Sequence, residues 1–192
     1  MSIKLNGATN GSVELDVPAA IGSDVSLTIP GAAGTLDRLE RAGNILQVVQ
    51  GSTSTQVLVS TTTYTPIGLQ ASITPTSTSS KILLLVSVQY QCYQLANLAG
   101  HGTRVKRGST VIKSPIQGAG GPYEIWRRSI GVSDMNYYDS LNYQILDSPA
   151  TTSSITYSVE GATYDSSSAV KYQSPGNAQN QVSTITLIEV AG

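Results

Sequence analysis

Residues 82–92 read Ile-Leu-Leu-Leu-Val-Ser-Val-Gln-Tyr-Gln-Cys and form the clearest strand pattern in the chain. Their even positions make one continuous apolar face, which predicts a β-strand with one side against a core along its whole length. Their odd positions are apolar only at Leu83 and Leu85 and turn polar from Ser87 onward. We therefore expect the N-terminal part of the chain or a neighbouring subunit to cover Leu83 and Leu85.

Shorter patterns of the same kind fill the rest of the chain. Strand patterns bounded by turn residues occur at 57–59, 123–132, 141–147, 154–160, 170–173 and 182–190, with a hairpin at 104–113 that turns near Gly108. In the last segment Ile185 and Leu187 share one face, while Val182, Ile188 and Val190 share the other, which predicts burial on both sides. Roughly eight to ten short strands of this kind predict an all-β fold, a jelly-roll-like β-sandwich.

Residues 1–45 differ from the rest because they carry an internal repeat, V-x-L-x-[VI]-P-[AG]-A, at a spacing of twelve residues. Each copy alternates apolar and polar residues and ends at a proline, as a short half-buried strand does. So small a sheet cannot bury its own apolar face. We predict a β arm at 1–45, with one short helix at 36–42, and a β-sandwich head at 46–192. The residues predicted to dock on another protein or pack between subunits are Leu83 and Leu85 of the head and Val13, Leu15, Val17, Val25, Leu27 and Ile29 of the arm.

The composition excludes several classes of function. The 192 residues include 11 basic and 12 acidic side chains, a net charge of −1, and only 12% of the chain is charged, about half of the roughly 25% typical of soluble domains. Without an excess of positive charge, the chain is not expected to bind nucleic acid or an anionic membrane surface. Its longest aliphatic run is residues 82–86, so no membrane insertion is expected, and the first six residues lack the apolar region of a signal peptide.

The sequence shows no pattern that predicts catalysis, a cofactor or a bound metal. The single cysteine, Cys92, has no second thiol or histidine cluster with which to form a metal site. His101 lies between two glycines, which predicts a flexible loop position and not the held imidazole of a catalytic triad. Asp134 and Asp139 are the best local pair of carboxylates for hydrolysis, and a solvated loop is the preferred interpretation. We expect that the protein is not an enzyme.

A local basic segment is the first of two surface features. Six of the eleven basic residues fall within 25 positions; they are Arg104, Lys106, Arg107, Lys113, Arg127 and Arg128. The simplest interpretation is a solvated hairpin with ordinary salt bridges. The alternative is contact with an acidic protein surface or an anionic glycan.

An aromatic cluster is the second surface feature. Trp126, Tyr137 and Tyr138, with Asn136 beside them, combine rings that stack on a sugar or a protein partner with polar tips that keep the surface soluble. We predict these four residues as a site for a glycan or a partner. Packing in the core or between subunits is the alternative, because tyrosine is also a good strand residue.

Three blocks of the sequence resemble proteins of tailed-bacteriophage virions. The arm, with Ser-Ile-Lys-Leu-Asn-Gly at 2–7, Val-Glu-Leu-Asp-Val-Pro-Ala at 13–19 and Leu-Thr-Ile-Pro-Gly at 27–31, is similar to that of many such proteins, especially from marine and cyanobacterial phages. Residues 64–83, from Tyr-Thr-Pro to Ser-Ser-Lys-Ile-Leu, resemble the opening of a recurrent fibre-tip domain. Residues 183–192, Ser-Thr-Ile-Thr-Leu-Ile-Glu-Val-Ala-Gly, resemble its closing strand.

The resemblance implies a non-enzymatic homotrimer with a jelly-roll head, located on the virion and assembled in the host cytoplasm. Because a short arm and one head leave no room for a long shaft, we expect a capsid decoration, or cement, protein that stabilises the capsid and also contacts host surface glycans. A short tail fibre or tailspike tip that acts as a receptor-binding adhesin is the alternative. The implied partners are the chain itself, the major capsid protein or a tail adaptor, and a host surface polysaccharide, with no cofactor.

Overall fold

The computed structural model describes residues 3–6, 12–15, 41–93, 98–115, 125–128, 137–163, 169–176 and 179–192. By its contacts the chain divides into two compact units, residues 1–37 and 38–192. In the first unit, β1 (Ile3–Asn6) and β2 (Ser12–Leu15) pair in antiparallel fashion, with Ile3 opposite Leu15. The strand β2 covers the start of the first copy of the repeat, where the alternation of apolar and polar residues predicts a strand.

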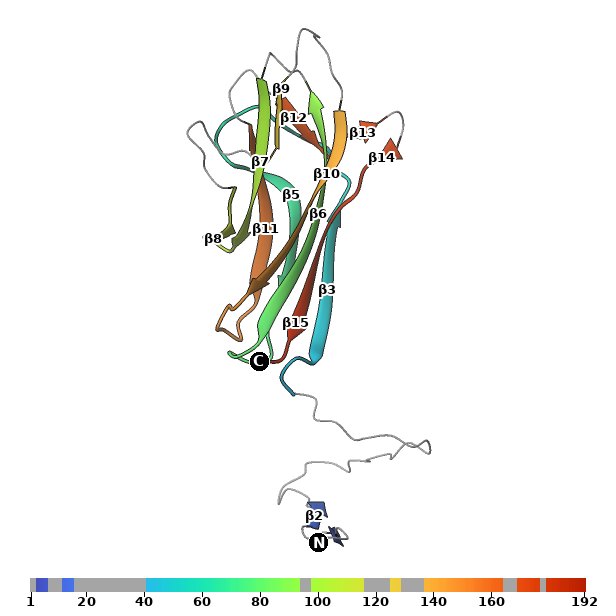
Figure 1. Cartoon of the computed structure of the whole chain (residues 1–192), viewed down its shortest axis with the longest axis vertical. Helices are drawn as coiled ribbons and strands as arrows, with labels where there is room; N and C mark the ends of the chain where they lie inside the picture. The colour runs from blue at the N-terminus through green and yellow to red at the C-terminus, as the bar shows by residue number, and fades with distance from the viewer. Residues whose placement is uncertain are drawn as a thin grey trace. The chain divides into compact units, whose positions relative to one another are not determined.

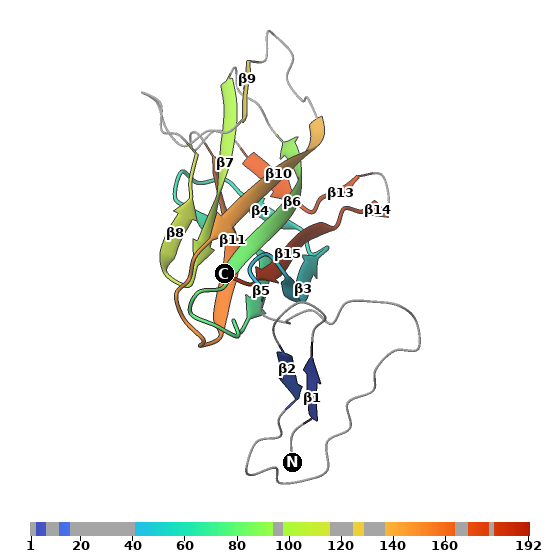
Figure 2. The same cartoon turned by 60° about the horizontal axis from the view of Figure 1, so that its bottom comes forward.

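The second unit is an antiparallel β-sandwich (Figures 1 and 2). Its larger sheet has six strands: β3 (Ile45–Thr53), β15 (Ser183–Val190), β6 (Lys81–Tyr93), β12 (Ala169–Tyr172), β4 (Val57–Val59) and β10 (Tyr137–Asp147), which pairs with β6. Its smaller sheet has five: β5 (Thr65–Ile73), β11 (Ile155–Thr163), β7 (Leu98–Arg107), β8 (Thr110–Lys113) and β9 (Ile125–Arg128), which pairs with β7. A separate short pair is formed by β13 (Pro175–Gly176) and β14 (Gln179–Asn180). This arrangement confirms the predicted all-β sandwich.

The strand β6 lies at the centre of the larger sheet. It pairs with β10 along one side, and with β15 and then β12 along the other. All its even residues from Ile82 to Cys92 are buried, as their apolar pattern predicts. They pack in one cluster with residues of the smaller sheet, including Leu69, Val105 and Tyr157. The core of the head is therefore the space between these two sheets.

The uncharged segment at residues 50–80 is also folded into strands. Alternate residues of β5 from Ile67 to Ile73 are buried, and the residues between them are exposed. The outward residues are Gly68, Gln70 and Ser72, and most threonines and serines of the segment lie in the turns between its strands. The predicted hairpin at 104–113 is present as β7 and β8, and Gly108 at its turn has a φ of 56°, which glycine adopts without steric strain.

The last strand differs from its prediction. Burial on both sides of β15 is wrong, because only the face with Ile185 and Leu187 is buried. Ile188 and Val190 on the other face are only partly buried, and Val182, just before the strand, is half exposed. The apolar residues on the second face therefore belong to a surface that the described part of the head does not cover.

Two other predicted elements fall largely outside the described residues. Of the helix expected at 36–42, only Arg41 and Ala42 are described, and they are not helical. The backbone turns there at Gly43, whose φ is 91°. Of the strand expected at 123–132, the structure describes β9 alone.

Candidate interaction surfaces

A row of apolar side chains crosses four neighbouring strands on the outer face of the larger sheet. Val48 of β3 lies opposite Ile188 of β15, and Ile188 also lies opposite Leu83 of β6. On the other side of β6, Leu83 lies opposite Leu146 of β10. Val48 and Leu146 at the two ends are each 59% exposed. Leu83, one of the predicted docking residues, therefore lies within an apolar row that no single stretch of sequence displays.

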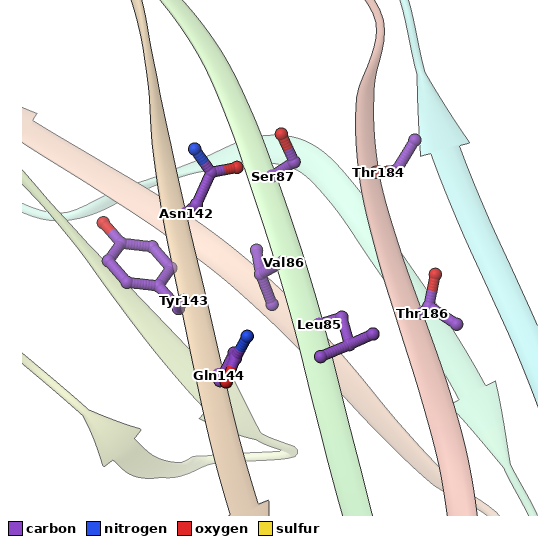
Figure 3. A pocket seen from close by; sticks show the side chains of 8 residues that line it. All are labelled: Leu85, Val86, Ser87, Asn142, Tyr143, Gln144, Thr184 and Thr186. Carbon is purple, nitrogen blue, oxygen red and sulfur yellow. The ribbon is translucent and has the colours of Figure 1, made fainter.

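Leu85, the other predicted docking residue of the head, is 37% exposed and lies one row further along the same face. It lines a hollow of about 370 Å³ over β6, between β10 and β15 (Figure 3). The remaining lining residues are Val86, Ser87, Asn142, Tyr143, Gln144, Thr184 and Thr186. The lining offers hydroxyl, amide, aliphatic and aromatic groups and contains no carboxylate, imidazole or thiol. The hollow therefore suits uncharged groups of a partner.

The predicted glycan site is only partly described. Trp126 lies on β9 of the smaller sheet, and Tyr137 and Tyr138 begin β10 of the larger sheet, near the same end of the head (Figures 1 and 2). Tyr138 is 40% exposed on the outer face. The side chains of Trp126 and Tyr137, and the whole of Asn136, lie outside the described part of the chain, so the site stays a prediction.

Of the six docking residues predicted in the arm, the structure describes the backbone of two. Val13 and Leu15 belong to β2, opposite Leu5 and Ile3 of β1. The other four, Val17, Val25, Leu27 and Ile29, lie outside the described residues. Their role in docking or subunit packing stays a prediction.

Three of the six residues of the basic segment form salt bridges. Arg104 Nε and Lys106 Nζ lie 2.6 Å and 3.2 Å from the carboxylate oxygens of Glu160. Arg107 lies 2.9 Å from Asp147, which joins the smaller sheet to the larger one. For these three residues the interpretation as an ordinary salt-bridged hairpin is confirmed.

The other basic residues take no part in these ion pairs. Lys113 lies over the ring of Tyr143, with Nζ 3.5 Å from the ring centroid, and burial lowers the pKa of Lys113 to about 8. Arg127 and Arg128 belong to β9, and their side chains lie outside the described ones. The alternative of contact with an acidic surface or glycan stays a prediction for these residues.

His101 requires a correction, because the flexible loop predicted for it is wrong. It lies within β7 and is only 1% exposed. Its ring centroid is 4.2 Å from that of Tyr90, and its Nδ1 lies 3.3 Å from the hydroxyl of Tyr172. Burial lowers the pKa of His101 to about 3, against an opposing effect of the Asp139 charge. The flanking Gly100 and Gly102 are buried residues of the same strand. Glycine in a strand permits the close approach of neighbouring groups.

Glu189 is a buried carboxylate that sequence reasoning missed. It accepts hydrogen bonds from Gln47 Nε2 at 2.5 Å and from both the backbone nitrogen and the hydroxyl of Thr76 at 2.7 Å. Burial raises the pKa of Glu189, but the hydrogen bonds from Gln47 and Thr76 outweigh it, so this pKa lies below its usual range. The signal was available in the alternation of β15, because Glu189 follows Ile185 and Leu187 on the inward face.

The described residues offer no further chemistry. Among them no group of three or more His, Cys, Asp or Glu side chains is placed to hold a metal ion, and no helix has the length and apolarity needed to span a membrane. Asp139 is exposed on β10, and Asp134, its expected partner in the carboxylate pair, lies outside the described residues. That pair is therefore untested.

No protein-family model matches the chain, and no curated protein is similar to it. Among solved structures, the chain is similar to two described as the structure of infectious bursal disease virus, Gx strain and Gt strain. Both have a TM-score of 0.33 and 16% sequence identity, covering 97% and 96% of this chain and 45% and 46% of the matched chains. The chain thus spans a little under half the length of these structures. A likeness at this TM-score assigns neither a family nor a function.

Proposed function

We propose that the chain is a virion surface protein of a tailed bacteriophage, a homotrimeric capsid decoration protein that stabilises the capsid. In this proposal the arm, residues 1–45, docks on the major capsid protein, and the β-sandwich, residues 46–192, forms the outward head. The protein assembles onto the virion in the host cytoplasm. The proposal assigns it no cofactor and no catalytic activity.

The observation that carries the proposal is that the two phage-like blocks of the head meet in space. The block at 64–83 contributes β5 and the start of β6, and the block at 183–192 contributes β15. β15 pairs with β6 in continuous register, and Glu189 accepts hydrogen bonds from Thr76. Blocks that are distant in sequence thus belong to one structural unit, which supports a resemblance to one domain and not to scattered low-complexity segments.

The arm has the chemistry that a capsid clamp needs. Its repeat places apolar residues at every second position, so each copy is expected to form a short strand with one apolar face. Such a segment binds by adding a strand to an exposed sheet edge or by laying its apolar face on a partner. Because it binds the assembled capsid and not separated subunits, its binding free energy stabilises the assembled state.

Substitutions in the first repeat test the capsid-docking role in the full chain. Replacing Val13, Leu15 and Val17 with serine removes the apolar face, and we expect the affinity for bare capsids to fall at least tenfold, which corresponds to ~1.4 kcal/mol. The matched control replaces the intervening Glu14 and Asp16 with serine and retains the affinity. Equal binding by the apolar-face variant, measured by co-sedimentation with capsids, would show that the arm does not dock the protein.

A second candidate function, the receptor-binding tip of a short tail fibre or tailspike, is favoured by the exposed ring of Tyr138. Its ring stands on the outer face at the start of β10, and β9, which carries Trp126, lies near the same end of the head (Figure 1). Exposed aromatic rings with polar tips suit contact with a host surface polysaccharide. This role is compatible with capsid decoration.

Two measurements separate the candidate functions. Many copies per virion, counted by quantitative mass spectrometry, support decoration, and a few trimers per virion support a tip. For the adhesin, full-chain binding to host polysaccharide is compared with that of Trp126→Ala, Tyr137→Ala and Tyr138→Ala. The control is Leu146→Ala, near the other end of β10. Binding that survives all three aromatic substitutions removes this proposed site.

A further inference from the structure

The hollow over β6 presents outward side chains from three neighbouring strands (Figure 3). They form two rows across the sheet, one with Gln144, Leu85 and Thr186 and the next with Asn142, Ser87 and Thr184. Leu85 is aliphatic, and the other five bear a hydroxyl or an amide. The hollow is therefore one apolar side chain surrounded by neutral groups that form hydrogen bonds.

Neighbouring side chains hold three of these polar groups in place. Gln50 Nε2 donates to Thr186 Oγ1 at 2.9 Å, and Gln89 Nε2 donates to Ser87 Oγ at 3.3 Å. Asn142 Nδ2 donates at 3.2 Å to the serine hydroxyl two residues before it. Both acceptor hydroxyls thus keep their own proton to donate, and the amide of Asn142 keeps its oxygen as an acceptor. Groups that are already oriented lose less conformational entropy when a ligand binds.

The chemistry of the lining excludes a charged ligand and an apolar one. An anion needs basic side chains and a cation needs carboxylates, and none of the described lining residues is charged. Lys81 and Lys171 lie on the same face beyond its two ends, outside the lining. An apolar ligand removes water from five polar side chains and offers them no hydrogen bonds in return. The lining therefore suits a neutral ligand that is rich in hydroxyl groups.

The size of the hollow favours a small ligand over a protein partner. Its volume of about 370 Å³ lies within the range of small-molecule sites. Three strands with about three lining residues each span roughly 14 by 10 Å, whereas a protein partner in a stable complex usually covers about 800 Å². One or two sugar rings match the smaller area.

A second observation on the same face extends the site. Tyr138 lies opposite Gln91 on the outer face of β10 and is 40% exposed. It precedes Asn142 by four residues, which is roughly 13 Å along the strand. The outward pair between them is Ser140 and Gln89, again a hydroxyl and an amide. The neutral surface thus continues from the hollow to an exposed aromatic ring.

We infer that this outer strip, from Leu85 to Tyr138 along β6 and β10, binds a neutral oligosaccharide. Sugar hydroxyls both donate and accept hydrogen bonds, as the hydroxyls and amides of the strip do. Leu85 and the ring of Tyr138 offer apolar surfaces to the C–H faces of sugar rings. The inference rests on the host-polysaccharide contact of the proposed function, and it names a location and a ligand class for that contact that require neither Trp126 nor Asn136.

A matched pair of glutamine substitutions tests the strip in the full chain. Gln144→Ala removes an amide of the hollow, and Gln70→Ala removes an amide from β5 of the other sheet. Both side chains are exposed, so neither change is expected to affect folding. The probe is an array of neutral and acidic oligosaccharides, followed by titration calorimetry with a retained one. We expect retention of neutral members, binding weakened roughly five- to tenfold by Gln144→Ala, and binding within about twofold for Gln70→Ala.

Ligand length tests the part of the strip beyond the hollow. Tyr138→Ala is expected to weaken binding of a tetrasaccharide about fivefold and to leave a disaccharide of the same sugar unaffected, because only the longer ligand reaches from the hollow to the ring. Equal effects on both lengths would contradict a continuous strip.

The outcomes separate this inference from the proposed function. Retention of acidic glycans alone, or of none, would overturn the inference, and so would unchanged binding by Gln144→Ala. Loss of binding with Trp126→Ala but not with Gln144→Ala would place the glycan at the aromatic cluster instead. None of these variants alters the arm, so co-sedimentation with capsids tests the decoration role independently of any glycan.

Discussion

His101 occupies an environment in which only the neutral imidazole is favourable. The ring lies against Tyr90 and near Tyr172, and among the described residues Nε2 is buried without a hydrogen-bond partner. Protonation there buries a positive charge, and the Asp139 charge offsets this cost only in part. The folded-state pKa of His101, about 3, lies below the ordinary value of 6.5. The unfolded chain therefore binds a proton at a higher pH than the folded chain does.

This linkage predicts acid destabilisation that starts well above the carboxylate range. The contribution of neutral His101 is fully present above pH 6.5 and is lost as the pH falls from 6.5 towards 3, by roughly 2 kcal/mol at pH 5. We expect the urea midpoint of the wild type to drop between pH 7 and pH 5. His101→Gln, which cannot titrate, is the control and has a flatter profile over that range. Parallel profiles for the two chains would contradict the assignment.

The strand β15 shows how one carboxylate fixes an element in place. Glu189 lies on the inward face near the C-terminal end of the strand, where Gln47 of β3 and Thr76 of the segment between β5 and β6 donate hydrogen bonds to it. The carboxylate therefore joins three separate parts of the head. Glu160 on β11 is a useful comparison, because its partners Arg104 and Lys106 are 28% and 22% exposed and stay hydrated when unpaired.

Neutralising the two glutamates is expected to have unequal effects. Glu189→Gln turns an amide group towards buried donors and leaves hydrogen bonds unmade, so we expect a loss of about 2–3 kcal/mol in the free energy of unfolding. Glu160→Gln removes ion pairs with partners that reach water, for which we expect a loss of about 1 kcal/mol or less. Chemical denaturation of both variants at pH 7 measures the difference. Equal losses would show that Glu189 is not the stronger anchor.

The chain divides into two compact units, and the described core cluster belongs to the second. Among the described residues, the members of the main core cluster and the apolar side chains packed against it all lie between Val49 and Leu187. The described part of the first unit is the two-stranded pair of β1 and β2, and a sheet of that size is marginal in water without a partner.

Removal of the first unit is therefore expected to leave the β-sandwich intact. Because residues 38–192 form one compact unit that holds the core cluster of the described residues, the chain 38–192 is expected to melt within about 3 °C of the full chain, which corresponds to roughly 1 kcal/mol or less for a domain of this size. Differential scanning calorimetry of both chains at low concentration, where subunit association is minimal, is the measurement. A much larger drop would place part of the core in the first unit.

The sequence by itself determined the local elements, because a strand shows its buried face at every second residue. The alternation at 82–92 located the central strand and its core-facing residues, and it marked Leu83 and Leu85 as apolar residues on the opposite face. The turn at Gly108 could be read in the same way. These features depend on neighbours within a few residues, so no knowledge of the fold is needed to find them.

Only the tertiary structure decided which strands lie side by side. The apolar row joins Val48, Leu83, Leu146 and Ile188, and the burial of His101 and Glu189 depends on strands distant in sequence. Cross-strand pairing brings residues within about 5 Å whatever their separation along the chain. Because that pairing is fixed by packing of the whole sandwich, no local pattern contains it.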